Sequence, residues 1–222
     1  MANTSKALGW LNDITNARYS LWFNGSETLR AASSGLTLLS GKTFDLSSGT
    51  ITLPTRTALI DLEHQLVQTT GATLAATETA GNFHRPVGTN QLWIQGEESL
   101  SETEVSVGYL TFTLPENYVS AGTITLRAFV DVQGAGTLGT CTVDFSAYLM
   151  TLATGAVGSD LVTTAATAVT ATGAAADFTV TPTGLAAGDK LVVKLTTSIA
   201  ESAGTAIRAV ITQLAAIVQV NK

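Results

Sequence analysis

The residues that could do chemistry in this chain are few, and the densest group of them is acidic. Glu97, Glu98, Glu102 and Glu104 all fall within the segment GEESLSETEV. Two carboxyl groups held ~5 to 9 Å apart around a sugar could cleave a glycosidic bond. The surrounding Ser and Thr residues are typical of a polar loop between strands, so the pattern favours a solvated surface over a catalytic pair.

The remaining candidates do not form a known catalytic or metal-binding pattern. His64 follows Glu63 with no third ligand nearby, and His84 precedes Arg85 in an expected loop. The segment 134–136 (Gly-Ala-Gly) follows an expected strand but lacks the Lys-Ser/Thr pair and the helix of a phosphate loop. The single cysteine, Cys141, lies among strand residues and is typical of a small buried apolar side chain. We therefore expect no catalytic residues, no metal site and no cofactor.

The chain carries unusually few charges. Charged residues make up 13% of the sequence, against about 25% in typical soluble domains. Free monomers usually keep a charged surface for solubility, so a Thr-, Ser-, Ala- and Gly-rich exterior indicates burial against other chains. The composition predicts an obligate oligomer or assembly component, and a monomer with a neutral, Thr-rich exterior is the alternative.

The sign of the charge argues against two classes of partner. The formal net charge is −6 and the isoelectric point is about 4.8, so no broad basic field is available for nucleic acid or for anionic lipid. The first residues, MANTSKALGW, contain no apolar run of signal-peptide length, and no segment reaches ~18 uninterrupted apolar residues. We expect a protein made in a cytoplasm, with neither nucleic acid nor membrane as a partner.

Residues 1–54 are expected to form an N-terminal arm. Leu8, Leu11 and Ile14, with Trp10 near the same side, predict a short amphipathic helix between Ser5 and about residue 16. The runs YSLWF and SETLRA on either side of Asn-Gly (24–25) predict a hairpin with a two-residue turn. Three short Gly-punctuated strands follow, and their apolar residues, two apart in each strand, are Leu36, Leu38, Phe44, Leu46, Ile51 and Leu53.

Residues 55–90 are expected to form a short helix and a linker. Leu59, Leu62 and Leu66 are spaced as on one side of a helix in ALIDLEHQLVQ. Residues 69–90 are rich in Thr, Ala and Gly and contain a proline, which is typical of a long loop. A single copy of the N-terminal arm has too little core to be stable by itself. Three copies of the arm around a common axis would bury the apolar residues of its short strands against one another.

Residues 91–222 are expected to form the main domain. Alternation is clear in one segment at Ile124, Leu126, Ala128 and Val130, and in another at Val105, Val107 and either Tyr109 or Leu110. The fold class is all-β: an eight-stranded jelly roll or β-sandwich with a β-rich N-terminal arm and one or two short helices. The eight expected strands are 91–100, 104–115, 122–132, 139–150, 160–171, 177–184, 189–199 and 205–220.

The segment LTLLSGKTFDLSSGTITLP resembles Gly-punctuated segments in the stems and N-terminal arms of bacteriophage tail fibres and other virion proteins, which are commonly trimeric. A simple β-meander that extends the main domain is the alternative. Residues 114–220, with LPENYVSAGTITL and GDKLVVKL, are similar to jelly-roll domains of tailed-phage virion proteins. Those domains often have Arg where this chain has Thr196 and Thr197, which leaves the subfamily open.

These resemblances imply assembly without catalysis: a homotrimeric capsid decoration or cement protein on the virion surface, bound to the major capsid protein and made in the host cytoplasm. The alternative is a head or tail fibre whose jelly roll binds a host glycan, with Trp93 and Tyr118 as the aromatic candidates. The arm residues expected to bind the capsid are Trp10, Leu11, Ile14, Trp22 and Phe23. The residues expected at the trimer interface are Leu36, Leu38, Phe44, Leu46, Ile51, Leu59, Leu62 and Leu66.

Overall fold

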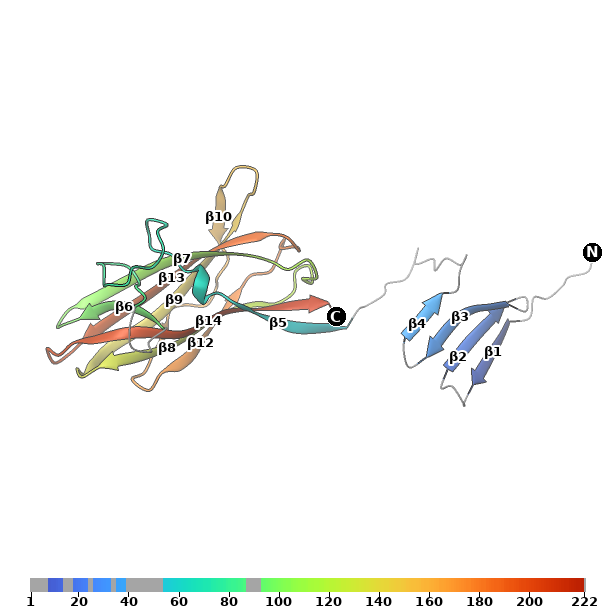
Figure 1. Cartoon of the computed structure of the whole chain (residues 1–222), viewed down its shortest axis with the longest axis horizontal. Helices are drawn as coiled ribbons and strands as arrows, with labels where there is room; N and C mark the ends of the chain where they lie inside the picture. Colours follow the sequence, from blue (N-terminus) through green and yellow to red (C-terminus); the bar gives the residue numbers. More distant parts are fainter. Residues whose placement is uncertain are drawn as a thin grey trace, which may run out of the picture. The chain divides into compact units, whose positions relative to one another are not determined.

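The computed structural model divides the chain into two compact units, 1–52 and 53–222 (Figure 1). It describes residues 8–13, 18–23, 26–32, 35–38, 54–86 and 93–221. No helix within these ranges is long and apolar enough to span a membrane.

The N-terminal unit contains one antiparallel sheet of four strands in sequence order, β1 (Leu8–Asp13), β2 (Arg18–Phe23), β3 (Ser26–Ala32) and β4 (Gly35–Leu38). The pairing of Phe23 with Ser26 confirms the hairpin predicted around residues 24–25. The helix predicted between Ser5 and residue 16 is wrong, because β1 occupies its centre. A helix of that length is marginal by itself, whereas β1 pairs with β2 along all six of its residues.

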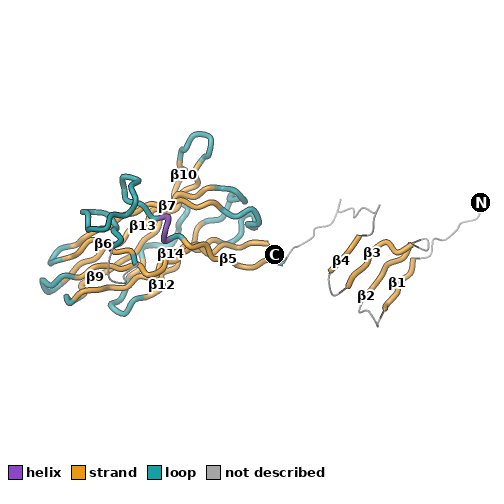
Figure 2. The backbone as a smooth tube through the Cα atoms, in the orientation of Figure 1, coloured by secondary structure: helices purple, strands orange, loops and turns teal. Residues whose placement is uncertain are grey.

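The second unit is a β-sandwich of two antiparallel sheets (Figures 1 and 2). The first sheet runs β10 (Val157–Asp160), β9 (Leu138–Met150), β13 (Lys190–Glu201) and β7 (Thr103–Thr113), and β11 (Thr167–Ala168) also pairs with β9. The second runs β12 (Ala174–Val180), β8 (Ile124–Gly134), β14 (Ile207–Asn221) and β5 (Thr55–Asp61), and β6 (Ile94–Ser99) also pairs with β14.

The strand order is that of a jelly roll. From β6 onward, one sheet reads β6-β14-β8-β12 and the other β7-β13-β9-β11, so chain neighbours repeatedly fall in opposite sheets. This pairing of the first strand with the last and the second with the last but one confirms the predicted eight-stranded jelly roll. Strands β5 and β10 are additions, and the strand expected over 160–171 is reduced to β11.

The core between the sheets follows the predicted alternation in β8 but not in β7. Ile124, Leu126, Ala128 and Val130 are completely buried. In β7 it is Leu110, not Tyr109, that is buried in the core. Val105 and Val107 lie on the outward face of the strand, and Val105 is 42% exposed. The odd-numbered and the even-numbered positions of β7 both fit the alternation of a strand, so the pairing of β7 with β13 decides which of them face the core.

Residues 54–86 belong to the sandwich, where the sequence predicted a helix and a linker. β5 pairs with β14 along its whole length, and one 3₁₀ turn, Glu63–Gln65, replaces the predicted helix. The backbone N–H of Leu62 donates to the carbonyl of Leu214 at 2.9 Å. Further along, Val67 bridges to Tyr109 and Asn82 to Val107. The predicted linker therefore covers the edge of β7, which would otherwise expose unpaired backbone groups.

Candidate functional site

The register of the N-terminal sheet places apolar residues in one row across all four strands. Trp10 is the cross-strand partner of Leu21, Leu21 of Leu29, and Leu29 of Leu38. Positions two apart along a strand share a face, so this apolar face also includes Leu8, Tyr19, Phe23, Ala31 and Leu36, together with one polar residue, Asn12.

Four of the five residues predicted to bind a capsid are divided between the two faces of this sheet. Trp10 and Phe23 fall on the apolar face, whereas Leu11 and Trp22 fall on the opposite one. Ile14 lies outside the described residues. The opposite face also carries polar residues, since Leu11 is in register with Ser20 and Ser20 with Arg30.

The residues predicted at a trimer interface lie in different environments. Leu36 and Leu38 lie on the apolar face of the N-terminal sheet, and Leu59 on β5 is 58% exposed. Leu62 and Leu66 are buried in the core of their own chain, with 0% and 3% exposure. The interface prediction is wrong for these two, because the turn after β5 directs them inward. The other three, Phe44, Leu46 and Ile51, lie outside the described residues.

Tyr118, one of two aromatic candidates for sugar binding, is a core residue. It is 4% exposed, and its hydroxyl donates to the carbonyl oxygen of Gly122 at 2.6 Å. Burial, followed by the nearby Asp189 carboxylate, raises the pKa of its phenol. Tyr118 thus locks a turn and is not available to stack on a sugar. The second candidate, Trp93, is half-buried directly before β6.

The acidic group of GEESLSETEV is used for local contacts. The carboxylate of Glu97 accepts the backbone N–H of Gly81 at 2.7 Å, and that of Glu98 accepts a hydrogen bond from Arg208. Partial burial and then the neighbouring carboxylates of Glu97 and Glu102 raise the pKa of Glu104. Within the described parts of the chain, no three His, Cys, Asp or Glu side chains gather where they could hold a metal ion.

Cys141 has the environment that its sequence context predicts. It is 2% exposed, and burial raises the pKa of its thiol to about 11. At neutral pH the group is a thiol, and a thiol is a poor nucleophile compared with a thiolate. Cys141 therefore acts as a small apolar residue of the core.

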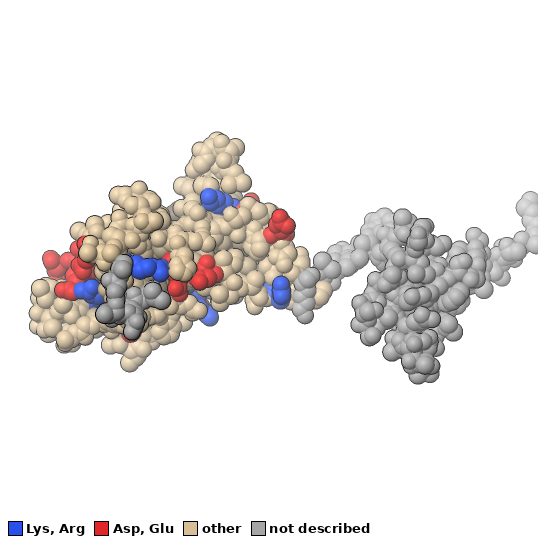
Figure 3. All heavy atoms as spheres, in the orientation of Figure 1, with Lys and Arg blue, Asp and Glu red and all other residues tan. Residues whose placement is uncertain are grey.

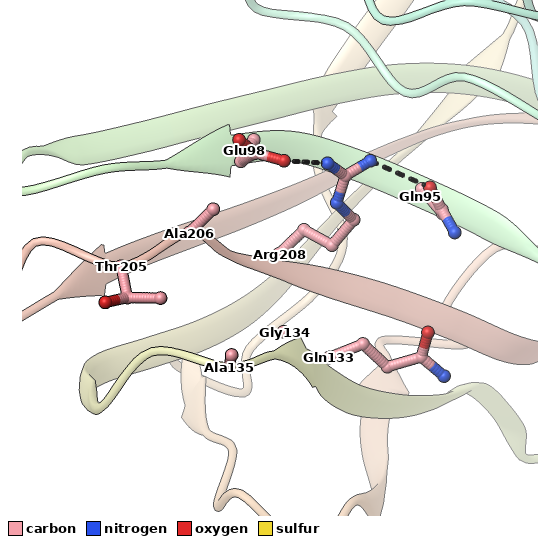
Figure 4. Close-up of a pocket in the computed structure, with 8 residues that line it drawn as sticks. All are labelled: Gln95, Glu98, Gln133, Gly134, Ala135, Thr205, Ala206 and Arg208. Carbon is pink, nitrogen blue, oxygen red and sulfur yellow. Dashed lines mark hydrogen bonds and ion pairs between the residues drawn. The ribbon is translucent and has the colours of Figure 1, made fainter.

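A polar cleft lies at the ends of β6, β8 and β14 (Figure 4). Arg208 lies at its centre: Nη1 donates to Oε1 of Gln95 at 3.1 Å, and Nη2 donates to the Glu98 carboxylate. Glu78, from the loop before β6, lies 3.7 Å from Nη1 of Arg208 and accepts the backbone N–H of Glu98 at 3.0 Å. The cleft has a volume of about 450 Å³ and is lined by Gln95, Glu98, Gln133, Gly134, Ala135, Thr205, Ala206 and Arg208.

Glycine at the end of β8 allows the close approach of two turns that shapes this cleft. Gly134 has φ of +131°, and a Cβ at this position would lie 2.2 Å from the carbonyl oxygen of Ala206. Any other residue would push the two backbones apart. The sequence analysis did not predict this cleft; the signals that could have indicated it are the Gly-Ala-Gly run and Arg208, a lone cation inside the apolar strand segment AIRAVI.

Comparisons with known proteins give distant structural similarity alone. No family model matches the chain, and no curated protein matches it. One similar solved structure is the carbohydrate-binding module TmCBM61 in complex with β-1,4-galactotriose, at 11% identity and a TM-score of 0.31, covering 76% of this chain and 89% of that one. Another comes from a study of promiscuous specificity in carbohydrate-binding modules of the β-sandwich superfamily, at 11% identity and a TM-score of 0.31, covering 94% of this chain and 74% of that one.

Proposed function

We propose that this chain is a non-enzymatic structural protein of a tailed-phage virion, most specifically a homotrimeric capsid decoration protein. Its N-terminal unit joins three copies and attaches them to the major capsid protein. The jelly roll is the part displayed at the capsid surface. The virion assignment rests on the sequence resemblances of the segments 36–54 and 114–220.

The observation that carries the assembly role is the apolar row Trp10–Leu21–Leu29–Leu38. A sheet with one apolar face is stable only when that face is packed against another layer. Burying each large apolar side chain contributes roughly 1.5 to 3 kcal/mol. Three identical sheets around a common axis supply that layer to one another, so trimerisation satisfies the requirement without a second protein.

The opposite face of the same sheet provides a separate surface for the capsid. Leu11 and Trp22 lie there among polar positions, and a mixed surface with an aromatic anchor is typical of protein interfaces. A trimer formed through the apolar face leaves the opposite face of each of its three sheets available to bind the capsid. Three weak contacts on one particle give avidity that no single contact would supply.

The exterior of the sandwich supports a role in contact with other proteins. In the view of Figure 3, charged side chains are sparse on the sandwich and most of its surface is uncharged. The hairpin formed by β9 and β10 carries Leu152 and Val157, which are 68% and 53% exposed. Neutral surfaces with exposed apolar residues are common where a protein is packed among neighbours.

The trimer is tested by light scattering on the purified full chain, with a variant on each face of the N-terminal sheet. We expect a mass three times the chain mass of 22.9 kDa. Leu21→Lys places a charge in the apolar row and is expected to give monomers, while the adjacent Ser20→Lys, on the other face, stays trimeric. Thermal unfolding of the sandwich serves as the control for folding. A monomeric wild-type protein would contradict the proposal.

The capsid role is tested on particles stripped of the protein. A decoration protein predicts that stripped capsids lose resistance to heat and osmotic shock, and that added wild-type protein restores it. Trp22→Ala is expected to weaken this rescue while the trimer persists. Unchanged capsid survival together with lost adsorption to the host would instead favour the fibre role.

A further inference from the structure

We propose that the cleft between the ends of β6, β8 and β14 binds a neutral, hydroxyl-rich ligand, such as one sugar residue of a glycan. This inference is independent of the virion role, since it concerns a site within the sandwich alone. The site also differs from the aromatic candidates that the sequence offered, because it is built around the ion pair of Arg208 and Glu98.

The charge balance of the cleft selects a neutral ligand. The charged residues that line the cleft are Arg208 and Glu98, which are paired with each other, and the carboxylate of Glu78, outside the lining, lies 3.7 Å from Arg208. An anionic ligand would meet an excess of negative charge and would have to displace a carboxylate from Arg208. A cation would meet the guanidinium at the centre of the site. A neutral ligand avoids both costs.

The polar groups match the hydrogen bonding of adjacent hydroxyls. The guanidinium offers donors only, the carboxylates offer acceptors only, and the amides of Gln95 and Gln133 offer both. A hydroxyl donates one hydrogen bond and accepts others, so two neighbouring hydroxyls can be satisfied by one carboxylate and one guanidinium together. Figure 4 shows the side chains of Gln95, Glu98 and Arg208 converging on the side of the cleft formed by β6.

These groups are held in place before a ligand arrives, which reduces the entropy lost on binding. Gln95 accepts from Arg208 and also contacts the side chain of His84. His84 is 3% exposed, and burial, the largest influence, lowers the pKa of its imidazole, which is therefore neutral at pH 7. Glu78 is fixed by the backbone N–H of Glu98.

The size and lining of the cleft favour a small ligand bound weakly. Its volume of about 450 Å³ falls within the range of roughly 300 to 1,000 Å³ usual for ligand sites. Four of the lining residues are small: Gly134 and Ala135 at the end of β8, and Thr205 and Ala206 before β14. None of the lining residues is aromatic, so the site distinguishes sugars by their hydroxyls, and we expect affinities in the millimolar range.

Saturation-transfer difference NMR on the full chain tests this site. The probes are methyl glycosides of glucose, galactose and mannose, free N-acetylglucosamine, and glucuronate as the anionic comparison. Ala135→Tyr fills the cleft from an exposed position, and Ala153→Tyr, at the exposed tip of the β9–β10 hairpin, is the matched control. Gln133→Ala removes one amide without adding bulk and is the second variant if Ala135→Tyr does not fold.

We expect at least one neutral sugar to give a saturable signal in the wild type and in Ala153→Tyr. In Ala135→Tyr or Gln133→Ala the dissociation constant should rise about tenfold or more, as expected for the loss of a hydrogen bond to a polar site. The inference is overturned if no neutral sugar binds, if glucuronate alone binds, or if the folded cleft variants bind as the wild type does. Light scattering on the same samples measures the oligomeric state, so a failure of the trimer proposal can be told apart from a failure of sugar binding.

Discussion

The contact between Phe145 and Phe178 gives the sharpest test of the sandwich itself. Phe145 lies on β9 and Phe178 on β12, so the pair joins the two sheets across the core. The ring centroids are 5.1 Å apart at an interplanar angle of 69°, an edge-to-face arrangement. Their exposures are 2% and 0%. Truncating either ring removes a fully buried side chain and leaves a cavity between the sheets.

The magnitude follows from burial and from ring geometry. A buried Phe→Ala change costs about 3 to 5 kcal/mol, and an edge-to-face pair contributes about 0.5 to 1.5 kcal/mol beyond its burial. We therefore expect Phe178→Ala to lower the free energy of unfolding by about 4 kcal/mol. The double variant should be less destabilised than the sum of the single variants by about 1 kcal/mol, which is the coupling of the pair.

Urea unfolding followed by tryptophan fluorescence and by circular dichroism measures these free energies. Phe129→Ala is the control, since Phe129 lies on β8 with 37% of its surface exposed and should cost much less. A Phe178→Ala variant as stable as Phe129→Ala would refute the placement of β12 over β9. Strictly additive effects of the two core changes would refute the ring contact.

Two further predictions concern the register and the pH dependence of the sandwich. Leu126→Asp places an unpaired charge at a completely buried position and should abolish soluble expression. The control Thr125→Asp, on the outward side of the same strand, should be tolerated. Normal melting of Leu126→Asp would contradict the register of β8. Burial raises the pKa of Glu201, but the backbone N–H groups of Gly204 and Ala203, with others, outweigh it and lower that pKa overall. Its ionised form thus stabilises the fold above the pKa of the unfolded chain, and this stability is lost as pH falls through the folded pKa. Glu201→Gln should lower the melting temperature at pH 7 and change it little in strong acid; an equal loss at both pH values would show that the carboxylate charge is not responsible.

The sequence predicted the body of the sandwich because its strands alternate cleanly. In β13 every second residue from Leu191 to Ile199 is buried. Such a pattern allows only one choice of the face that packs against the core. It did not predict β5 or the 3₁₀ turn after it. The leucine spacing of residues 59–66 fits a helix locally, and only the pairing of β5 with β14 makes it extended.

The cleft could be anticipated only in fragments. Gly134 was visible as part of a glycine-rich run, and Arg208 as a charge within an apolar segment, but they are far apart in the chain. They meet because β8 and β14 are neighbours in one sheet, with Arg208 in register with Gln133. Glu78 arrives from a loop that the sequence presents as a linker, so no spacing rule connects it to the site.

Local alternation, turn residues and sparse charge are properties of the chain itself, and they were sufficient to define an all-β jelly roll with few ionised groups. Which of two alternating sets faces inward in β7, where β5 pairs and how Arg208 meets its carboxylates depend on contacts between distant segments. Those contacts are chosen by the free energy of the whole packed sandwich. Leu66 illustrates the difference: its spacing suggested an interface, and it became core because Gly108 of β7 leaves room for it.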